Sequence, residues 1–133
     1  MYVKRGRDDV PSISNENLFG GTGMVHGRQL LGEDPALRGI LPGFPGDFDS
    51  TIHFIHETII DVGTTVGTHP HKGSEEVYFF IEGEAEMIID GEKVLVKPGD
   101  AVLTKNGSVH STRNTGNVPI RILVVEGGVE EKK

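Results

Sequence analysis

From position 50 onward, hydrophobic residues gather in short runs that are typical of β-strands. The runs are rich in β-branched and aromatic residues and are joined by short polar or glycine-containing segments. Asp90-Gly91 lies between two apolar runs and favours a two-residue type I′ hairpin turn. No segment has a helical period of ten or more residues. Strands are expected within residues 50–60, 76–83, 84–96 (a hairpin), 100–104, 108–114 and 120–127.

The first 49 residues are less regular. Residues 1–23 are polar and glycine-rich, so we expect an arm or loop outside the core. Residues 24–31 predict a first strand. A single helical turn is expected around Pro35–Arg38, followed by a loop through two further prolines. With strands recurring about every ten residues later in the chain, the pattern predicts an all-β sandwich or barrel.

The segment Val77–Ile81 is apolar on both faces of its predicted strand. Tyr78 and Phe80 have one parity, and Val77, Phe79 and Ile81 have the other. A strand with one wet face alternates apolar and polar residues, so a second surface is expected to cover the outer face. The N-terminal arm is one candidate for that surface. A partner subunit is the preferred one, which predicts a homodimer.

Composition narrows the class of protein. A length of 133 residues fits one domain, and glycine, at 19 residues, is concentrated at turns. The formal net charge of −7 argues against a nucleic-acid partner. The absence of cysteine excludes disulfides and zinc–thiolate sites. No apolar run resembles a signal peptide or a membrane span, so we expect no membrane association and a cytoplasmic location.

Two closely spaced histidines precede the strand at 76–83. His69 and His71 are two residues apart, so on an extended chain both side chains leave the same face. A bend at Gly73 can reset the alternation so that Glu76 points the same way as Tyr78 and Phe80. A carboxylate inside a barrel needs a compensating charge. The alternatives are a bound cation or a solvated loop that happens to hold two imidazoles.

These motifs resemble those of the cupins. The first cupin motif is a glycine, His-x-His, a glutamate and a closing glycine, and it is matched here by Gly63, His69, His71, Glu76 and Gly83. The second motif is matched by Gly99, Gly107, His110 and Asn114. Lys105 stands where that motif has a proline. The resemblance covers about residues 50–127, with residues 24–31 similar to the lead-in strand of small cupins.

The resemblance implies a double-stranded β-helix, or jelly-roll, barrel over residues 24–127, with an N-terminal arm (1–23) and a solvated C-terminal tail (128–133). It also implies that His69, His71, Glu76 and His110 bind one divalent metal ion per chain. Four ligands close a tetrahedral zinc site but leave two positions open on octahedral Mn²⁺ or Fe²⁺. Manganese or iron is therefore favoured, with zinc or nickel as alternatives.

Several other residues are candidates for a supporting role. Tyr78, Thr112 and Asn114 share the parity of the proposed ligands on their strands, and they would either orient a ligand or substrate or fill the barrel. His53 and His56 have opposite parity on one strand, so at most one is expected to face inward. Glu57, His53 and Tyr78 are candidate acid–base groups. Glu75 is expected to be a solvated neighbour of Glu76. Lys105 and Arg113 are either contacts for an anionic substrate or surface residues.

Two classes of function follow from the resemblance. The first is a metalloenzyme acting on a small sugar or carboxylic acid, such as a dioxygenase, decarboxylase or isomerase, with the metal as a Lewis acid or O₂-activating centre. The second is a non-catalytic sensor or small-ligand-binding module with a structural metal. The enzyme is the preferred reading, although a fold does not fix the chemistry.

Overall fold

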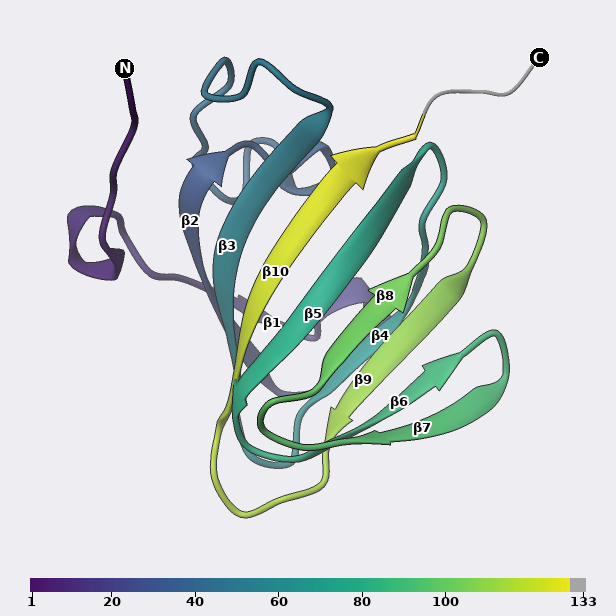
Figure 1. Cartoon of the computed structure of the whole chain (residues 1–133). Coiled ribbons are helices and arrows are strands. Elements are labelled where there is room, and N and C mark those ends of the chain that lie inside the picture. Colours follow the sequence, from purple (N-terminus) through teal and green to yellow (C-terminus); the bar gives the residue numbers. More distant parts are fainter. Residues whose placement is uncertain (130–133) are drawn as a thin grey trace.

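The computed structural model describes residues 1–129, and its regular secondary structure is almost entirely β-strand (Figure 1). Residues 130–133 of the expected tail lie outside the described residues. The strands are β1 (Ile13–Glu16), β2 (Met24–Gly32), β3 (Ile52–Ile60), β4 (Thr65–Pro70), β5 (Ser74–Glu82), β6 (Ala85–Ile89), β7 (Glu92–Val96), β8 (Ala101–Thr104), β9 (Val109–Asn114) and β10 (Ile120–Gly128). Three short 3-10 turns complete the list: η1 (Arg7–Asp9), η2 (Leu18–Gly20) and η3 (Pro35–Leu37).

The strands form two antiparallel sheets that face each other across one core (Figure 1). The larger sheet has the order β1-β2-β3-β10-β5-β8, and the smaller has the order β4-β9-β6-β7. Strands far apart in the sequence are neighbours, as in the pairing of β10 with both β3 and β5. This is the jelly-roll barrel that the motifs implied. None of the helical turns in residues 1–129 is long and apolar enough to cross a membrane.

The core lies between the two sheets and is formed by alternate residues of each strand. On β10, the even-numbered residues Ile120, Ile122 and Val124 are buried, and on the flanking strands Phe54 and Phe80 are fully buried. Alternation of this kind is what a strand with one face on the core requires. At one end of the barrel the same inward face carries polar side chains in place of aliphatic ones, and that end contains the candidate site.

Several expected elements are confirmed. The hairpin between β6 and β7 turns at Asp90 and Gly91, whose φ angles of 51° and 81° are those of the left-handed region that a type I′ turn needs. The strand expected at residues 24–31 is β2, and the helical turn expected around Pro35–Arg38 is η3.

Two strands were not expected from the sequence. Residues 65–70 are polar and hold His69, yet they form β4 because their backbone pairs with β9. Within the segment expected to be an arm, β1 pairs with β2 and extends the larger sheet, and Val10 is buried. Both segments lack an apolar run, so the only signal for them is the backbone pairing offered by a neighbouring strand.

Glu57 lies on the outer face of the larger sheet and not in the barrel. Its carboxylate binds Arg7, Arg28 and Arg121 at 2.9–3.1 Å, and its side chain is almost completely buried by them. Burial raises the pKa of Glu57, but hydrogen bonds from Arg7 and Arg121 outweigh that effect and lower it overall. The sequence expectation that Glu57 is an acid–base candidate for the site was therefore wrong, because Glu57 lies on the face of β3 opposite to that of the buried Phe54 and Ile60.

The outer face of β5 remains exposed. Phe79 and Ile81 have 42% and 37% of their surface exposed. The N-terminal segment joins the sheet at β2, which is separated from β5 by two strands, so the arm does not cover them.

We expect Glu57→Ala to lower the free energy of unfolding by about 2 kcal/mol, because it leaves three neighbouring arginines without their common carboxylate. The arginines are partly exposed, so solvent screening keeps the loss below that of a fully buried pair. The stabilisation by Glu57 is present above the carboxyl's unfolded-state pKa and is lost as the pH falls through its lower folded-state pKa.

Urea denaturation at pH 7 measures this loss. The control is Glu86→Ala, which removes a carboxylate that binds Lys93 and Arg113 on the surface and is expected to have a much smaller effect. Equal losses from the two variants would contradict a structural role for the Glu57 cluster.

Candidate metal centre

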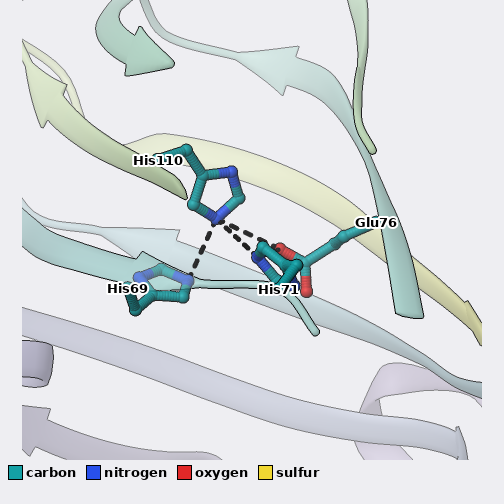
Figure 2. Close-up of side chains that lie close together, drawn as sticks. All are labelled: His69, His71, Glu76 and His110. Atoms are coloured by element: carbon teal, nitrogen blue, oxygen red, sulfur yellow. Dashed lines mark hydrogen bonds and ion pairs between the residues drawn. The ribbon is translucent and has the colours of Figure 1, made fainter. Parts of the chain in front are cut away.

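Four side chains converge at the polar end of the barrel, from three strands and one loop (Figure 2). His69 lies on β4 directly opposite His110 on β9, and His71 follows the end of β4. The chain then bends at Gly73, whose φ of 79° is readily adopted by glycine, and Glu76 enters the site from β5. The bend resets the alternation as expected, and Glu75 is exposed.

The four candidate ligand atoms lie close together. The Nε2 atom of His110 lies 3.0 Å from the Nε2 atoms of both His69 and His71. The Oε1 atom of Glu76 lies 3.4 Å from the Nε2 atoms of His71 and His110. All four groups offer an atom within 4.8 Å of every other. In Figure 2 the dashed lines from His110 reach each of the other three side chains.

A divalent cation fits this arrangement. The Oε1 atom of Glu76 is buried and has no hydrogen-bond partner among the described residues. One ring nitrogen cannot satisfy two others at 3.0 Å with a single proton, whereas atoms bound to one ion at about 2.1 Å lie at such separations from each other. A shared cation would account for both the unpartnered oxygen and the clustered nitrogens.

The other ring nitrogen of each histidine has a partner outside the cluster. His69 Nδ1 lies 2.9 Å from the carbonyl oxygen of Gly67, and His110 Nδ1 lies 2.8 Å from the hydroxyl of Thr104. His71 Nδ1 faces the Oε1 atom of Glu126 at 3.7 Å. Such contacts hold the rings with Nε2 directed at the common centre, which is how proteins orient metal-binding histidines.

Comparison with known protein families identifies the family that this chain matches. The model of the cupin domain family called Cupin_2 matches residues 56–126, which is more than half of the chain and includes the clustered residues. The chain belongs to the cupin family.

Individual relatives agree with this assignment. Over 79 residues the cupin is 37% identical to the uncharacterized protein MJ1618 of Methanocaldococcus jannaschii. The match covers 59% of this chain and 63% of that protein, so the chain spans less than two thirds of the relative's length. The crystal structure of a predicted oxalate decarboxylase from Thermotoga maritima is 28% identical, with a TM-score of 0.77 and coverage of 96% of this chain and 99% of that one. The polyketide cyclase RemF from Streptomyces resistomycificus, at 19% identity and a TM-score of 0.67, shares the fold over 100% of this chain and 89% of its own.

The buried positions of the cluster change how its groups titrate in this cupin. Burial lowers the pKa of His110 to about 3, aided by the neighbouring His69 and His71, and it also lowers the pKa of His69. Burial raises the pKa of Glu76 to about 8. For His71, burial favours the neutral form, but the carboxylates of Glu126 and Glu76 outweigh it and raise the pKa.

A cavity of about 430 Å³ lies beside the cluster, and His69, His71 and Glu76 line it. Tyr78 also lines the cavity, and its ring centroid lies 5.1 Å from that of His110. Burial raises the pKa of the Tyr78 phenol, which keeps it protonated at neutral pH. Thr112 is buried, and its hydroxyl oxygen has no hydrogen-bond partner among the described residues.

Asn114 is buried but does not line the cavity. Its side-chain amide nitrogen donates to the carbonyl oxygens of Ile60 and Val118, and its side-chain oxygen accepts from the backbone of Gly116. These contacts join the end of β9 to the end of β3 and to the loop between β9 and β10, so Asn114 holds that loop against the barrel. The two remaining sequence candidates for an anionic substrate, Lys105 and Arg113, are both exposed and outside the cavity.

His53 and His56 both line the cavity, which corrects the expectation that at most one faces inward. Glu126 of β10 pairs with Phe54 of β3, but Gly127 pairs with Ile52, so His53 is an extra residue in the ladder. This β-bulge breaks the alternation along β3. His53 Nδ1 consequently reaches Glu126 Oε2 at 2.9 Å, while burial lowers the pKa of His56 to about 4.

Three residues of the site were missed in the sequence. Glu126 has the parity of Ile122 and Val124, a signal that could have placed its carboxylate inside. Asp34 lines the cavity from the turn before η3. Phe19 stacks on the His69 ring with centroids 4.1 Å apart, in a left-handed backbone conformation with φ of 53°. No pattern in a polar arm predicts such a contact, although a strained residue often marks a functional site.

Metal affinity is expected to rise with pH between about pH 6 and 8. In the metal-free protein Glu76 is protonated below its pKa of about 8, and a metal binds the carboxylate, so binding releases a proton. For one released proton, each pH unit in this range lowers the dissociation constant about tenfold. Calorimetric titration in two buffers of different ionisation enthalpy counts the protons.

Glu76→Gln serves as the matched variant, since it keeps the shape of the side chain but has no proton to release. We expect weaker binding and a shallower pH dependence. An unchanged slope in the variant would show that the released proton comes from another group.

Proposed function

We propose that this cupin is a metalloenzyme acting on a small organic molecule, with one divalent ion per chain bound by His69, His71, Glu76 and His110. The observation that carries the proposal is the convergence of these four donors beside a cavity large enough for a substrate, with three of them lining it. When bound, the ion would supply Lewis-acid or O₂-activating chemistry.

The donor set favours manganese or iron, with zinc or nickel as alternatives. Three imidazole nitrogens and one carboxylate oxygen contain no thiolate, so they offer no preference for soft metals. Four protein donors would leave two positions of an octahedral ion for substrate or O₂, whereas they would complete a tetrahedral zinc site.

The chain's own groups support catalysis over a purely structural ion. Glu126 contacts Ser74 and His53 as well as His71, and His53 is about one third exposed, so ionisable groups run from the cluster toward solvent. Tyr78 brings a protonated phenol into the cavity. A structural ion would need neither an open cavity nor these groups. The similarity to a predicted oxalate decarboxylase adds support for chemistry on a carboxylic acid.

Elemental analysis of purified protein is the first test. We expect close to one equivalent of manganese or iron per chain, lost in His69→Ala/His71→Ala and strongly reduced in His110→Ala. The control is His26→Ala, which removes a histidine that binds Ser14 and Asp61 outside the cavity. Protein that neither contains nor binds manganese, iron, zinc or nickel would refute the four-ligand site.

Turnover separates the enzyme from the alternative, a non-catalytic sensor or ligand-binding module. We expect metal-loaded protein to consume O₂ or a carboxylic acid or sugar substrate, and His110→Ala to lose the activity while keeping the fold. Binding of small ligands without turnover across these classes would favour the non-catalytic module.

We also propose that the cupin is a homodimer that buries the outer face of β5. Register places Phe79 beside Leu123 on β10 and Ala101 on β8, and Val77 beside Val125 and Leu103, so apolar side chains cross three neighbouring strands. Phe79 and Leu103 are 42% and 47% exposed. An apolar row of this extent on a sheet face favours a partner, and a second copy presents the same row.

Light scattering coupled to size exclusion is expected to give twice the chain mass of 14.4 kDa. Phe79→Glu should shift the protein to the monomer mass. Leu95→Glu, which changes a 71% exposed leucine on β7 of the other sheet, should leave the dimer intact. A monomer for the unmodified protein at micromolar concentration would contradict the proposal.

A further inference from the structure

One part of the wall of the cavity beside the four clustered residues is apolar. Leu18 and Phe19 of η2 contribute to that wall, and so do Leu37 and Leu41 around and after η3. Leu37 and Leu41 are almost fully buried although they lie in a loop region. These side chains offer contact area to a ligand but no hydrogen bonds, so they match an apolar group.

Acidic groups outnumber lysine and arginine among the polar residues that line the cavity. Besides Glu76, the lining includes the carboxyl groups of Asp34 and Glu126, which are 7% and 8% exposed. Lys72 is the only lysine or arginine of residues 1–129 that lines the cavity, and it is exposed. A ligand with two negative charges would therefore meet two further carboxyl groups with little positive charge beyond that of a metal ion.

Arginine is the side chain best suited to bind a carboxylate through two parallel hydrogen bonds. None of the chain's six arginines is available to the cavity, since each binds a carboxylate that does not line it. The pairs are Arg5 with Asp47, Arg38 with Glu33, Arg113 with Glu86, and Arg7, Arg28 and Arg121 with Glu57.

We infer that the substrate is a singly charged or neutral chelating molecule with an apolar body, and not a small dicarboxylate such as oxalate. Its chelating atoms would face the metal ion bound by the four clustered residues. Its apolar body would pack against Leu18, Phe19, Leu37 and Leu41. This inference rests on the proposed metal site. If it holds, this cupin and the predicted oxalate decarboxylase share a fold but act on different substrates.

The test compares three chelating probes on manganese-loaded protein at pH 8. Benzohydroxamate and acetohydroxamate share one singly charged chelating head and differ in their apolar tail, while oxalate is doubly charged and has no tail. Calorimetry gives each dissociation constant, which is normalised to the probe's affinity for Mn²⁺ in free solution. Elemental analysis after each titration checks that the metal stays on the protein.

We expect benzohydroxamate to bind at least about tenfold more tightly than acetohydroxamate, because the phenyl group leaves water for the apolar wall. Oxalate is expected to be the weakest of the three after normalisation. Leu41→Ala should reduce the preference for the phenyl tail and leave acetohydroxamate unchanged. Val118→Ala, at a 49% exposed position outside the cavity, is its control.

Asp34→Asn tests the charge argument without changing the size of a side chain. Asp34 accepts a hydrogen bond from the backbone of Ala36, which an asparagine can also do. We expect this variant to bind oxalate several-fold more tightly and benzohydroxamate as before. Asp61→Asn, a change on a carboxylate outside the cavity, should alter neither.

The outcomes distinguish this inference from the proposed function. Protein that binds manganese and prefers oxalate to benzohydroxamate after normalisation would overturn the substrate class and leave the metal site standing. Protein that binds none of the probes would also overturn the substrate class. Failure to bind manganese, iron, zinc or nickel would refute the metal site, and this inference with it.

Discussion

The arrangement at the polar end of this barrel depends on the cost of burying one carboxylate. Glu76 lies 6% exposed among three imidazoles, and its Oε1 atom has no hydrogen-bond partner among the described residues. In the metal-free protein the group responds by taking up a proton, and its pKa rises to about 8. A divalent cation is the partner that would let the carboxylate and the three neighbouring Nε2 atoms all be satisfied. The shape of the site follows from that requirement.

The surrounding barrel supplies the rigidity that such a cluster needs. His69 and His110 face each other across a single pair of strands, so their separation is fixed by the backbone ladder. Contacts with Gly67, Thr104 and Glu126 orient the three rings from behind. Because these partners belong to strands or to the adjoining core, a small shift in one histidine would require a shift in the sheet.

The bulge on β3 brings a second pair of polar side chains, His53 and Glu126, together near the four clustered residues. It directs His53 toward Glu126 although neighbouring residues of opposite parity also face inward. Glu126 in turn contacts His71 and Ser74, and it extends the polar end of the cavity beyond the four clustered residues. On the outer face of the same strand, Glu57 binds three arginines and keeps them away from the cavity. The sheet thus separates these three arginines from the carboxyl groups and apolar side chains of the cavity.

The sequence by itself determined the strands with apolar runs, the type I′ turn at Asp90-Gly91, and the four residues that converge, since local patterning and two spaced motifs carry that information. Only the tertiary structure decided that polar residues 65–70 form a strand, that Phe19 stacks on His69, and that His53 joins His56 in the cavity. The physical reason is that strand pairing and bulges are set by the partner strand. A polar segment gains its hydrogen bonds from a neighbour distant in sequence, and one extra residue in a ladder reverses an alternation that the sequence alone presents as unbroken.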